Sequence, residues 1–446
     1  MGGSHPSIIT VKANPSGYHS VATERRGGVA VEAKGDDVVL DDLSREYVSL
    51  AFAIERLSPG FVDAHVGAEE IKAAAESGPT PDPAALLTRI DALRGAVASG
   101  TLPEDRQAFL MAQTRAMATV CGIAAGEKIA YLDEVRGNFD IEPRFTPELV
   151  FDTAIDELDA LLPGEGDVAS RLAAWRKGFV IPPETARRVI GVIMDETRRR
   201  TEAFAPLPEG EAVEIAFVSD KPWSGYNWYL GGNRSRVEVN TDLPIHAHEL
   251  TALITHEAYP GHHTEHSIKE RVLLHERGYG EHAVQLINTP QCVVSEGIAT
   301  LAESIVFPGE EGARWQAETL YPAAGIRGDA SQVARIAHDR IELRAVSGNA
   351  AILFHAEGAT EEEAVAYLMR YGLRTEPEAR QSFRFIKDPL WRAYVFTYHV
   401  GRDLLTRWLD GFAETERQSR FAGLLASQTT PAQIEREIAG RSTPTR

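Results

Sequence analysis

The residues best suited to chemistry lie in one short part of the sequence. His256 and Glu257 end a run with helical spacing, His262 and His263 follow closely, and Glu296 comes 33 positions after His263. Two neutral imidazoles and a carboxylate are the ligand set of a catalytic zinc ion that keeps one position open for water. A glutamate directly after the first histidine is suited to act as general base toward that water. We therefore expect the chemistry here.

The spacing of these histidines differs from the usual H-E-x-x-H, because Pro260 occupies the fourth position after His256. On a regular helix His262 would face about 240° away from His256, and His263 would lie roughly 10.5 Å along the axis. Pro260 removes a helical hydrogen bond and Gly261 accepts unusual dihedral angles, so a bulge here would bring His262 to the second ligand position. We favour His256 and His262 as ligands, with His263 as the alternative ligand.

Two strings around these residues, T-H-E-A-Y-P-G-H-H and S-E-G-I-A-T-L-A-E, resemble the bacterial family catalogued as domain of unknown function 885. That family is similar to the gluzincin metallopeptidases, including the thimet oligopeptidase and thermostable carboxypeptidase groups. Residues 233–241, 343–349 and 394–401 resemble further landmarks, and the match spans roughly residues 205–420. The resemblance implies a zinc peptidase in which Gly261-His262 closes the metal motif.

Helical periodicity dominates the rest of the chain. It predicts helices over 43–57, 82–99, 104–133, 146–162 and 183–204, the third long enough to be two helices. Alternating residues at 213–218 and 234–239 predict strands on either side of an aromatic and glycine-rich segment, 223–232. The sequence therefore predicts a mainly α protein with a small β-sheet just before the zinc helix.

The resemblance adds a two-lobed, metallopeptidase-like arrangement with a deep cleft. Residues 1–204 are then an N-terminal helical region and residues 205–446 a catalytic region, as lobes of one folded unit. Peptidases of this kind often hold an extended substrate against an edge strand. This makes the strand over 234–240 a candidate wall of the cleft, with Arg236 and Asn240 as candidate substrate contacts. An ordinary half-buried strand is the alternative.

Residues elsewhere in the chain are candidates to complete the site. Tyr398 and His399 occupy the place in chain order of the oxyanion donor in similar enzymes. Glu303 and His263 are candidate supports for a ligand histidine. Arg344 offers a guanidinium fork to a substrate carboxylate. For each of these residues, packing or a salt bridge within the protein is the competing interpretation.

The chain departs from the family pattern on the expected substrate side. Ile298 follows the Glu-Gly pair where the family has an aromatic residue, and Thr264-Glu265 stands where it has Leu-Gln. The region of Trp391 and Arg392 replaces a polar glutamine ahead of the C-terminal tyrosine. These changes weaken the inference of a substrate more than that of a metal.

Composition excludes several classes of function. The net charge of −19 over 446 residues argues against binding nucleic acid or anionic membranes. No run approaches the 18 or more apolar residues of a membrane helix, and the N-terminus lacks a targeting pattern. The two cysteines, Cys121 and Cys292, do not make a disulfide framework. We expect a cytoplasmic protein.

These observations predict a zinc-dependent hydrolase that cleaves amide bonds of short peptides. One Zn²⁺ per chain, or another divalent metal, would be held by His256, His262 and Glu296, with Glu257 as general base. One alternative is a metal-dependent amidase or lyase that acts on a non-peptide small molecule in a specialised pathway. The other is a protein that binds metal or peptide without catalysis. The expected partner is a short peptide or small amide; the sequence leaves the physiological substrate, endo- or exo-cleavage and oligomeric state open.

Overall fold

The computed structural model describes residues 38, 40–221 and 223–442. Contacts between Cα atoms place the described residues in one compact unit. The expectation about a targeting pattern at the N-terminus therefore lies outside the described residues. Helices make up 65% and strands 8% of the structure, which confirms a mainly α fold with small sheets. The predicted boundary at residue 204 and the two lobes with a cleft stay predictions.

Some of the N-terminal helices begin at residues that cap them or favour a first turn. Asp41 and Asp82 accept hydrogen bonds from the first turns of α1 and α3, and Pro183 occupies the first turn of α8. The predicted helix over 104–133 is two helices, separated by a turn and an extended stretch at 125–130. The bounds are α1 (Asp42–Glu55), α2 (Glu69–Ser77), α3 (Pro83–Ser99), α4 (Glu104–Ala124), α5 (Tyr131–Phe139), α6 (Glu148–Leu161), α7 (Val168–Lys177) and α8 (Pro183–Glu202).

The remaining helices follow the sheet and include short 3₁₀ and π segments. Their bounds are η1 (Ala247–Glu249), α9 (Leu250–Glu257), α10 (His262–Lys269), η2 (Glu270–Glu276), η3 (Gly280–Ala283), α11 (Pro290–Val306), α12 (Glu311–Trp315), η4 (Gln316–Leu320), α13 (Tyr321–Ala324), α14 (Ala330–Asp339), η5 (Glu342–Ala345), α15 (Val346–His355), α16 (Glu361–Gly372), α17 (Glu376–Lys387), α18 (Val395–Asp410), η6 (Glu414–Glu416), α19 (Arg417–Leu425) and α20 (Pro431–Ser442).

A three-stranded sheet lies directly before the metal-motif helices in the chain. Its strands are β3 (Ala212–Val218), β4 (Gly225–Gly231) and β5 (Arg234–Asn240), in the order β3-β5-β4. The sequence predicted β3 and β5, but the aromatic segment between them is a strand as well. Because β5 pairs in parallel with β3 and antiparallel with β4, neither side of it is free. The expectation that residues 234–240 form an edge strand for substrate is therefore wrong.

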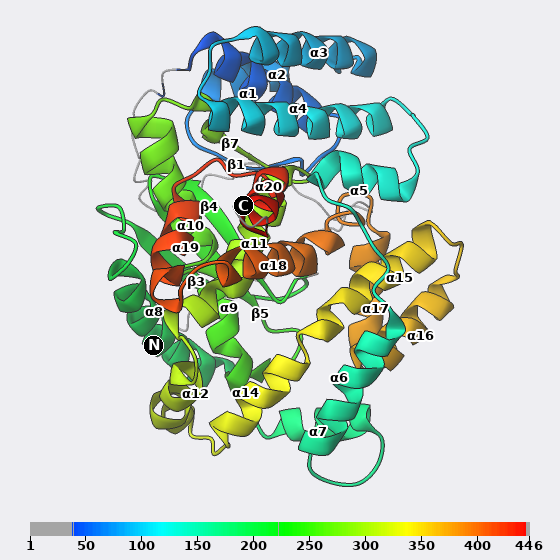
Figure 1. Ribbon diagram of the computed structural model, residues 1–446, viewed down its shortest axis with the longest axis vertical. Helices are drawn as coiled ribbons and strands as arrows, with labels where there is room; N and C mark the ends of the chain where they lie inside the picture. The colour runs from blue at the N-terminus through cyan, green and yellow to red at the C-terminus, as the bar shows by residue number, and fades with distance from the viewer. Residues whose placement is uncertain (1–37, 39, 222, 443–446) are drawn as a thin grey trace, which may run out of the picture. The chain divides into compact units, whose positions relative to one another are not determined.

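Two shorter strand pairs tie distant parts of the chain together. The strands are β1 (Val62–His65) with β7 (Val284–Leu286), and β2 (Val180–Ile181) with β6 (Ile245–His246), both antiparallel. Val284 and Leu286 of β7 lie in the same core cluster as apolar residues of α1, α3 and α4. The first pair thus joins the N-terminal helices to the metal-motif region and brings β1 beside it (Figure 1).

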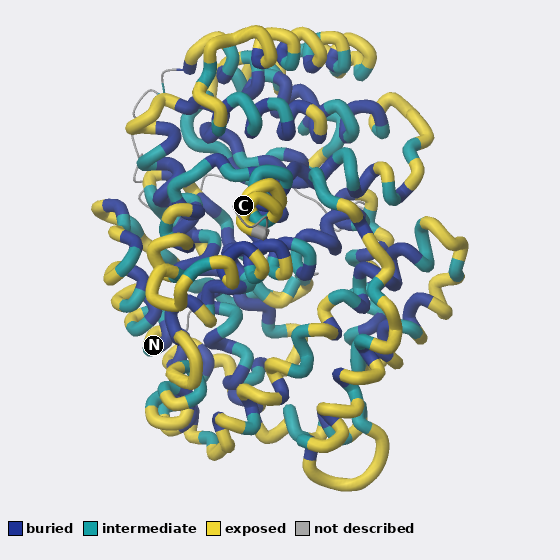
Figure 2. The backbone as a smooth tube through the Cα atoms, viewed as in Figure 1, coloured by how far each residue is buried: buried dark blue, intermediate teal, exposed yellow. Residues whose placement is uncertain are grey.

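Helices α11 and α18 cross at a pair of glycines, and α11 is buried along most of its length (Figure 2). A Cβ on Gly297 would lie 2.6 Å from the backbone oxygen of Gly401 and 2.7 Å from the Leu405 side chain. A Cβ on Gly401 would overlap the carbonyl oxygen of Val293. The two helices approach this closely only because both positions lack a side chain.

No single helix among the described residues is both long and apolar enough to cross a membrane. The segments Pro290–Val306 and Glu311–Ala324 meet that test only when they are taken together, and they are bent by 67° relative to one another.

Candidate active and metal site

The two histidines of the metal motif lie on separate helices. Helix α9 ends one residue after His256 and α10 begins at His262, with a cis Tyr259–Pro260 peptide bond between them. The Gly261 N–H donates to the carbonyl oxygen of Thr255 at 2.9 Å, and a Cβ on Gly261 would overlap that oxygen. A break between two helices, rather than the expected bulge within one, therefore turns His262 back toward His256.

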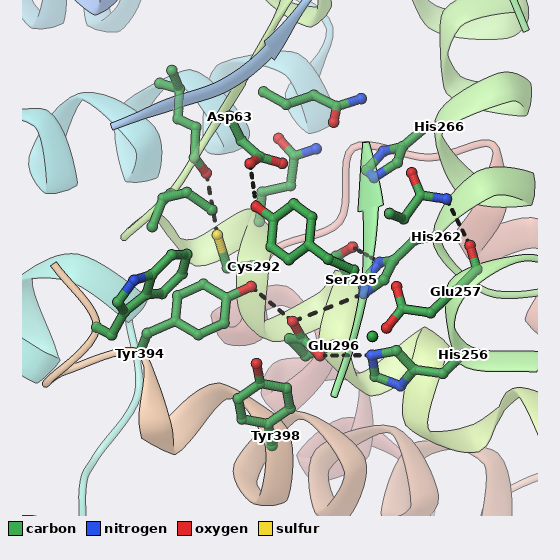
Figure 3. A pocket seen from close by; sticks show the side chains of 18 residues that line it. Asp63, His256, Glu257, His262, His266, Cys292, Ser295, Glu296, Tyr394 and Tyr398 are labelled. Carbon is green, nitrogen blue, oxygen red and sulfur yellow. Dashed lines mark hydrogen bonds and ion pairs between the residues drawn. The ribbon is translucent and has the colours of Figure 1, made fainter. Parts of the chain in front are cut away.

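Four side chains converge at this break (Figure 3). Nε2 of His256 lies 3.4 Å from Oε2 of Glu296, and Nε2 of His262 lies 3.8 Å from Oε1 of the same carboxylate. The two imidazole rings are nearly perpendicular, with centroids 4.8 Å apart. His256, Glu257 and His262 each offer a ligand atom, and these three atoms all lie within 4.8 Å of one another. The structure thus brings the three expected ligands and the expected base together.

A chain of hydrogen bonds fixes the tautomer of His262. Lys269 Nζ donates to Glu265 at 2.5 Å, and Ser295 Oγ donates to the same carboxylate at 2.5 Å. Nδ1 of His262 lies 3.2 Å from Ser295 Oγ. Because the serine proton points to Glu265, the serine oxygen accepts from Nδ1–H, which leaves a lone pair on Nε2 of His262. Burial opposes ionisation of Glu265, but Lys269, His266 and these hydrogen bonds lower its pKa to about 2.

Two tyrosines at the start of α18 approach Glu296. The Tyr394 hydroxyl donates to Oε1 of Glu296 at 2.8 Å, whereas Oε2 is buried without a hydrogen bond. Tyr398 lies one helical turn further along and faces the same space (Figure 3). Burial and the charge of Glu296 hold the pKa of both phenols well above the usual value. Both hydroxyls therefore carry their protons at neutral pH.

The two carboxylates of the site have opposite proton affinities. Burial raises the pKa of Glu257 and the charge of Glu296 adds to this, while His256 and His262 oppose it. Burial also works against the ionised form of Glu296, but the neighbouring imidazoles of His256 and His262 outweigh it and lower its pKa. Glu296 is thus the more acidic of the two carboxyl groups, and Glu257 has the higher proton affinity. Asn227 Nδ2 donates to the Glu257 backbone carbonyl at 2.7 Å and fixes the end of α9.

This donor set fits a divalent metal ion. Nε2 of His262 carries a lone pair and no proton, so it cannot donate a hydrogen bond to Glu296. Oε2 of Glu296 is buried without a hydrogen bond. Such atoms ordinarily have a partner, and a cation bound by His256, His262 and Glu296 would supply one to all of them. The hydrogen bond from His262 to Ser295 is the kind of outer contact that orients a ligand imidazole.

A cavity of about 100 Å³ opens beside the cluster. Asp63 of β1 and Tyr226 of β4 contribute to its wall, and the Tyr226 hydroxyl donates to the Asp63 carboxylate. Burial raises the pKa of Asp63 to about 6. The full lining is Asp63, Gly225, Tyr226, Asn227, His256, Glu257, His262, His266, Gln285, Leu286, Ile287, Gln291, Cys292, Ser295, Glu296, Trp391, Tyr394 and Tyr398.

His263 lies outside this cavity, contrary to the expectation that it is an alternative ligand or a support for one. Its ring is fully buried, with Nδ1 2.8 Å from Ser235 Oγ and Nε2 2.9 Å from the Glu211 carboxylate. Consecutive residues of α10 point about 100° apart, so His262 and His263 cannot face the same site. Both nitrogens of His263 are engaged on the side of the sheet.

Two further expected residues also point elsewhere. The His399 ring packs on Phe396 with centroids 5.6 Å apart, and a Cβ on Gly348 would lie 2.9 Å from its Cε1. His399 follows Tyr398 on α18 and so faces α15 instead of the cavity. Glu303 accepts a hydrogen bond from Gln316 at 3.3 Å rather than contacting a ligand histidine. The expected roles of His399 as oxyanion donor and of Glu303 as support are therefore wrong.

None of the three expected substrate contacts lines the cavity. The Asn240 amide donates to two backbone carbonyls of the segment before β4, at 2.9 and 2.8 Å, and so holds that segment in place. Arg236 is half exposed and lies 3.5 Å from Glu238 of the same strand. Arg344 is exposed on η5 and does not line the cavity. The expectations for Arg236 and Asn240 presupposed an edge strand that the sheet order rules out.

The sequence analysis missed several residues of the cavity wall. Tyr394 could have been found, because it lies four positions before Tyr398 and therefore on the same helical face. Asp63 gave no signal, since β1 spans only four residues and its partner strand is distant in sequence. Of the departures from the family pattern, Trp391 lines the cavity, whereas Ile298 is fully buried in the helical core.

The sequence matches no family model and no curated protein. Among solved structures, it is similar to a putative lipoprotein from Colwellia psychrerythraea, with a TM-score of 0.51 and 16% identity over 88% of this chain and 70% of that chain. A putative lipoprotein of unknown function from Shewanella oneidensis has a TM-score of 0.45 and 13% identity over 90% of this chain and 83% of that one. The first likeness concerns the fold alone, and the family resemblance stays a prediction.

Proposed function

We propose that this protein is a zinc-dependent hydrolase that cleaves the amide bond of a short peptide. The observation that carries the proposal is the convergence of His256 Nε2, His262 Nε2 and the buried Glu296 carboxylate, with Glu257 beside them. A zinc ion held by the first three residues would supply Lewis acidity and activate water. Another divalent ion is compatible with the same ligands.

In this proposal Glu257 moves the proton. Its carboxylate accepts a proton from the attacking water and passes it to the leaving nitrogen, a role that suits a buried carboxylate with a raised pKa. The Tyr398 hydroxyl donates a hydrogen bond to the oxygen that becomes negative as the carbonyl is attacked. Tyr394 holds Glu296 in position through its hydrogen bond to Oε1.

Metal content measured by mass spectrometry tests the proposal. We expect about one zinc ion per wild-type chain, and none in His256→Ala or Glu296→Ala. Glu257→Gln should keep the metal and lose about 10²- to 10⁴-fold in turnover of peptides, because it removes only the base. A metal-free wild-type protein after incubation with zinc, or a fully active Glu257→Gln variant, would contradict the proposal.

A non-peptide amide is the second candidate substrate class. The cavity of about 100 Å³ beside the cluster favours it, because a small amide would fit in this space next to Glu257 and Glu296. Parallel screens of short peptides and small amides distinguish the two classes.

We also propose that the protein is located in the cytoplasm. Its two cysteines are free and buried, as is common in a reducing compartment.

A further inference from the structure

The wall of the cavity away from the metal cluster carries an acidic side chain without a basic partner. Asp63 projects from β1 into the cavity from a different side than His256 and His262 (Figure 3). One of its oxygens accepts the Tyr226 hydroxyl hydrogen bond. Its other oxygen has no hydrogen bond within the part of the chain that the structure describes, and it is not sealed from the cavity.

The charges around Asp63 do not neutralise it. Its pKa rises to about 6 chiefly through burial, and the carboxylates of Glu296 and Glu55 raise it further. The Tyr226 hydrogen bond and His262 act in the opposite direction. Across the described residues no lysine or arginine lies within salt-bridge distance of Asp63, whereas the buried carboxylate of Glu265 is paired with Lys269. A buried carboxylate of this kind is stabilised by a bound cation.

A second acceptor stands beside Asp63. Gln285 of β7 pairs with Ala64 of β1, which places it next to Asp63 in the two-stranded sheet. Its side chain lines the same cavity, and its Oε1 is buried with no hydrogen-bond partner among the described residues. An ammonium group has three N–H donors and no acceptor, so a carboxylate and an amide oxygen are suitable partners for it.

We propose that Asp63 and Gln285 bind a protonated amine of the substrate. The inference deepens the proposed function and rests on it, because the amine site lies in the same cavity as Glu257 and the metal cluster. A substrate anchored in this way is a small molecule with a free amino group near its scissile amide, such as a dipeptide or an amino-acid amide. The amine is either a free α-amino group or the ammonium of a lysine-like side chain.

Equilibrium binding to the full chain tests this proposal without relying on turnover. The zinc-treated Glu257→Gln protein, which should bind substrate without consuming it, is titrated by calorimetry with alanyl-alanine and with its N-acetylated form. We expect acetylation, which removes the positive charge, to weaken binding at least about tenfold. N-acetyl-lysine amide distinguishes the two sources of the amine, because it retains only the side-chain ammonium.

The Asp63→Asn substitution in the same background sharpens the test. We expect it to abolish most of the difference between the free and acetylated probes, while Asp156→Asn, at an exposed position of α6, leaves the difference intact. If Asp63→Asn does not fold, the comparison of probes on the Asp63 protein still decides the matter. Equal binding of all probes, or no binding of any at about 10 mM, would overturn the proposal.

Metal content measured in parallel separates this inference from the proposed function. If two metal ions bind per chain and Asp63→Asn loses one, Asp63 is a metal ligand and the amine site is refuted. If the chain binds no metal yet still prefers the free amine, the hydrolase proposal fails and the amine site stands.

Discussion

The adjacent residues His262 and His263 belong to two different clusters of histidine and glutamate. The clusters differ in whether polar atoms are left without a hydrogen-bond partner. In the first, His256 and His262 face Glu296, one of whose oxygens is buried without a hydrogen bond. In the second, His263 lies between Ser235 and Glu211, and both of its ring nitrogens are engaged. The first cluster opens on a cavity, whereas the second is closed.

Residue type alone therefore does not distinguish a binding site from a structural hydrogen-bond cluster. Glu211 accepts hydrogen bonds from His263 and Arg198, at 2.9 and 2.7 Å, and from Tyr259, so its charge is fully satisfied within the protein. Glu296 has one donor, Tyr394, and one oxygen left over. A satisfied buried pair contributes to the fold, whereas unsatisfied donor atoms around a cavity indicate a site for a ligand.

Matched substitutions of the adjacent histidines are expected to give the largest contrast. His262→Gln should abolish metal binding, because it removes a direct ligand, whereas His263→Gln should retain about one metal ion per chain. Mass spectrometry of the two purified variants measures this. Loss of metal in His263→Gln, with the fold intact by circular dichroism, would contradict the division between the clusters.

Glu211→Gln should lower the free energy of unfolding by about 3 to 5 kcal/mol, because it removes the negative charge that accepts hydrogen bonds from buried His263 and Tyr259 and from Arg198. Hydrogen bonds and the charges around Glu211 outweigh burial and lower its pKa from 4.5 to about 2. This stabilisation is therefore present above pH 4.5 and is lost as the pH falls toward 2. Urea unfolding as a function of pH measures both effects, with Glu202→Gln, an exposed partner of the same Arg198, as a near-neutral control.

Ser295→Ala should weaken metal affinity by about 10- to 100-fold without abolishing it. The serine holds His262 through its Nδ1 and is itself held by Glu265, so its removal frees the ring to change orientation. Competition with a chelator measures the affinity. Ser304→Ala on the same helix, whose hydroxyl bonds only a backbone carbonyl, is the control that should bind as tightly as wild type.

Gly297→Ala is expected to destabilise the fold by about 1 to 3 kcal/mol, because its Cβ would press against the backbone of α18. Gly191→Ala in α8, where a Cβ meets nothing within 4 Å, should instead stabilise the protein by up to about 1 kcal/mol. Thermal unfolding of both variants measures the two changes in stability. Equal effects would mean that the helix crossing is looser than the structure indicates.

Much of the fold could be predicted from periodicity, because long amphipathic helices leave a strong signal. Helix α6 begins within two residues of its predicted start, and α4 covers most of the helix predicted over 104–133, whereas α5 begins only at Tyr131 and runs past the predicted end to Phe139. The aromatic segment that forms β4 was read as a link, since its glycines and polar residues broke the alternation. That one missed strand moved β5 from the edge to the centre of the sheet.

Some residues of the candidate site could likewise be predicted from the sequence, and others could not. His256, Glu257, His262 and Glu296 were predicted from residue types and from spacing along two helices. Residues next to a site residue on the same helix were wrongly assigned to the site, because adjacent helical residues face different directions. His399, which follows Tyr398, is an example. Asp63 and Gln285 could not be predicted, because a pairing across more than 200 residues leaves no local pattern.

Residue chemistry and local periodicity were enough to predict the predominance of helices and to nominate candidate metal ligands and a candidate base. Only the tertiary structure decided which histidine faces the cluster, since the break before Gly261 sets the rotation of α10 relative to α9. The tertiary structure also decided which buried carboxylates have hydrogen-bond partners for both oxygens and which have an oxygen without one. That outcome depends on contacts between distant segments, whose energies no local pattern contains.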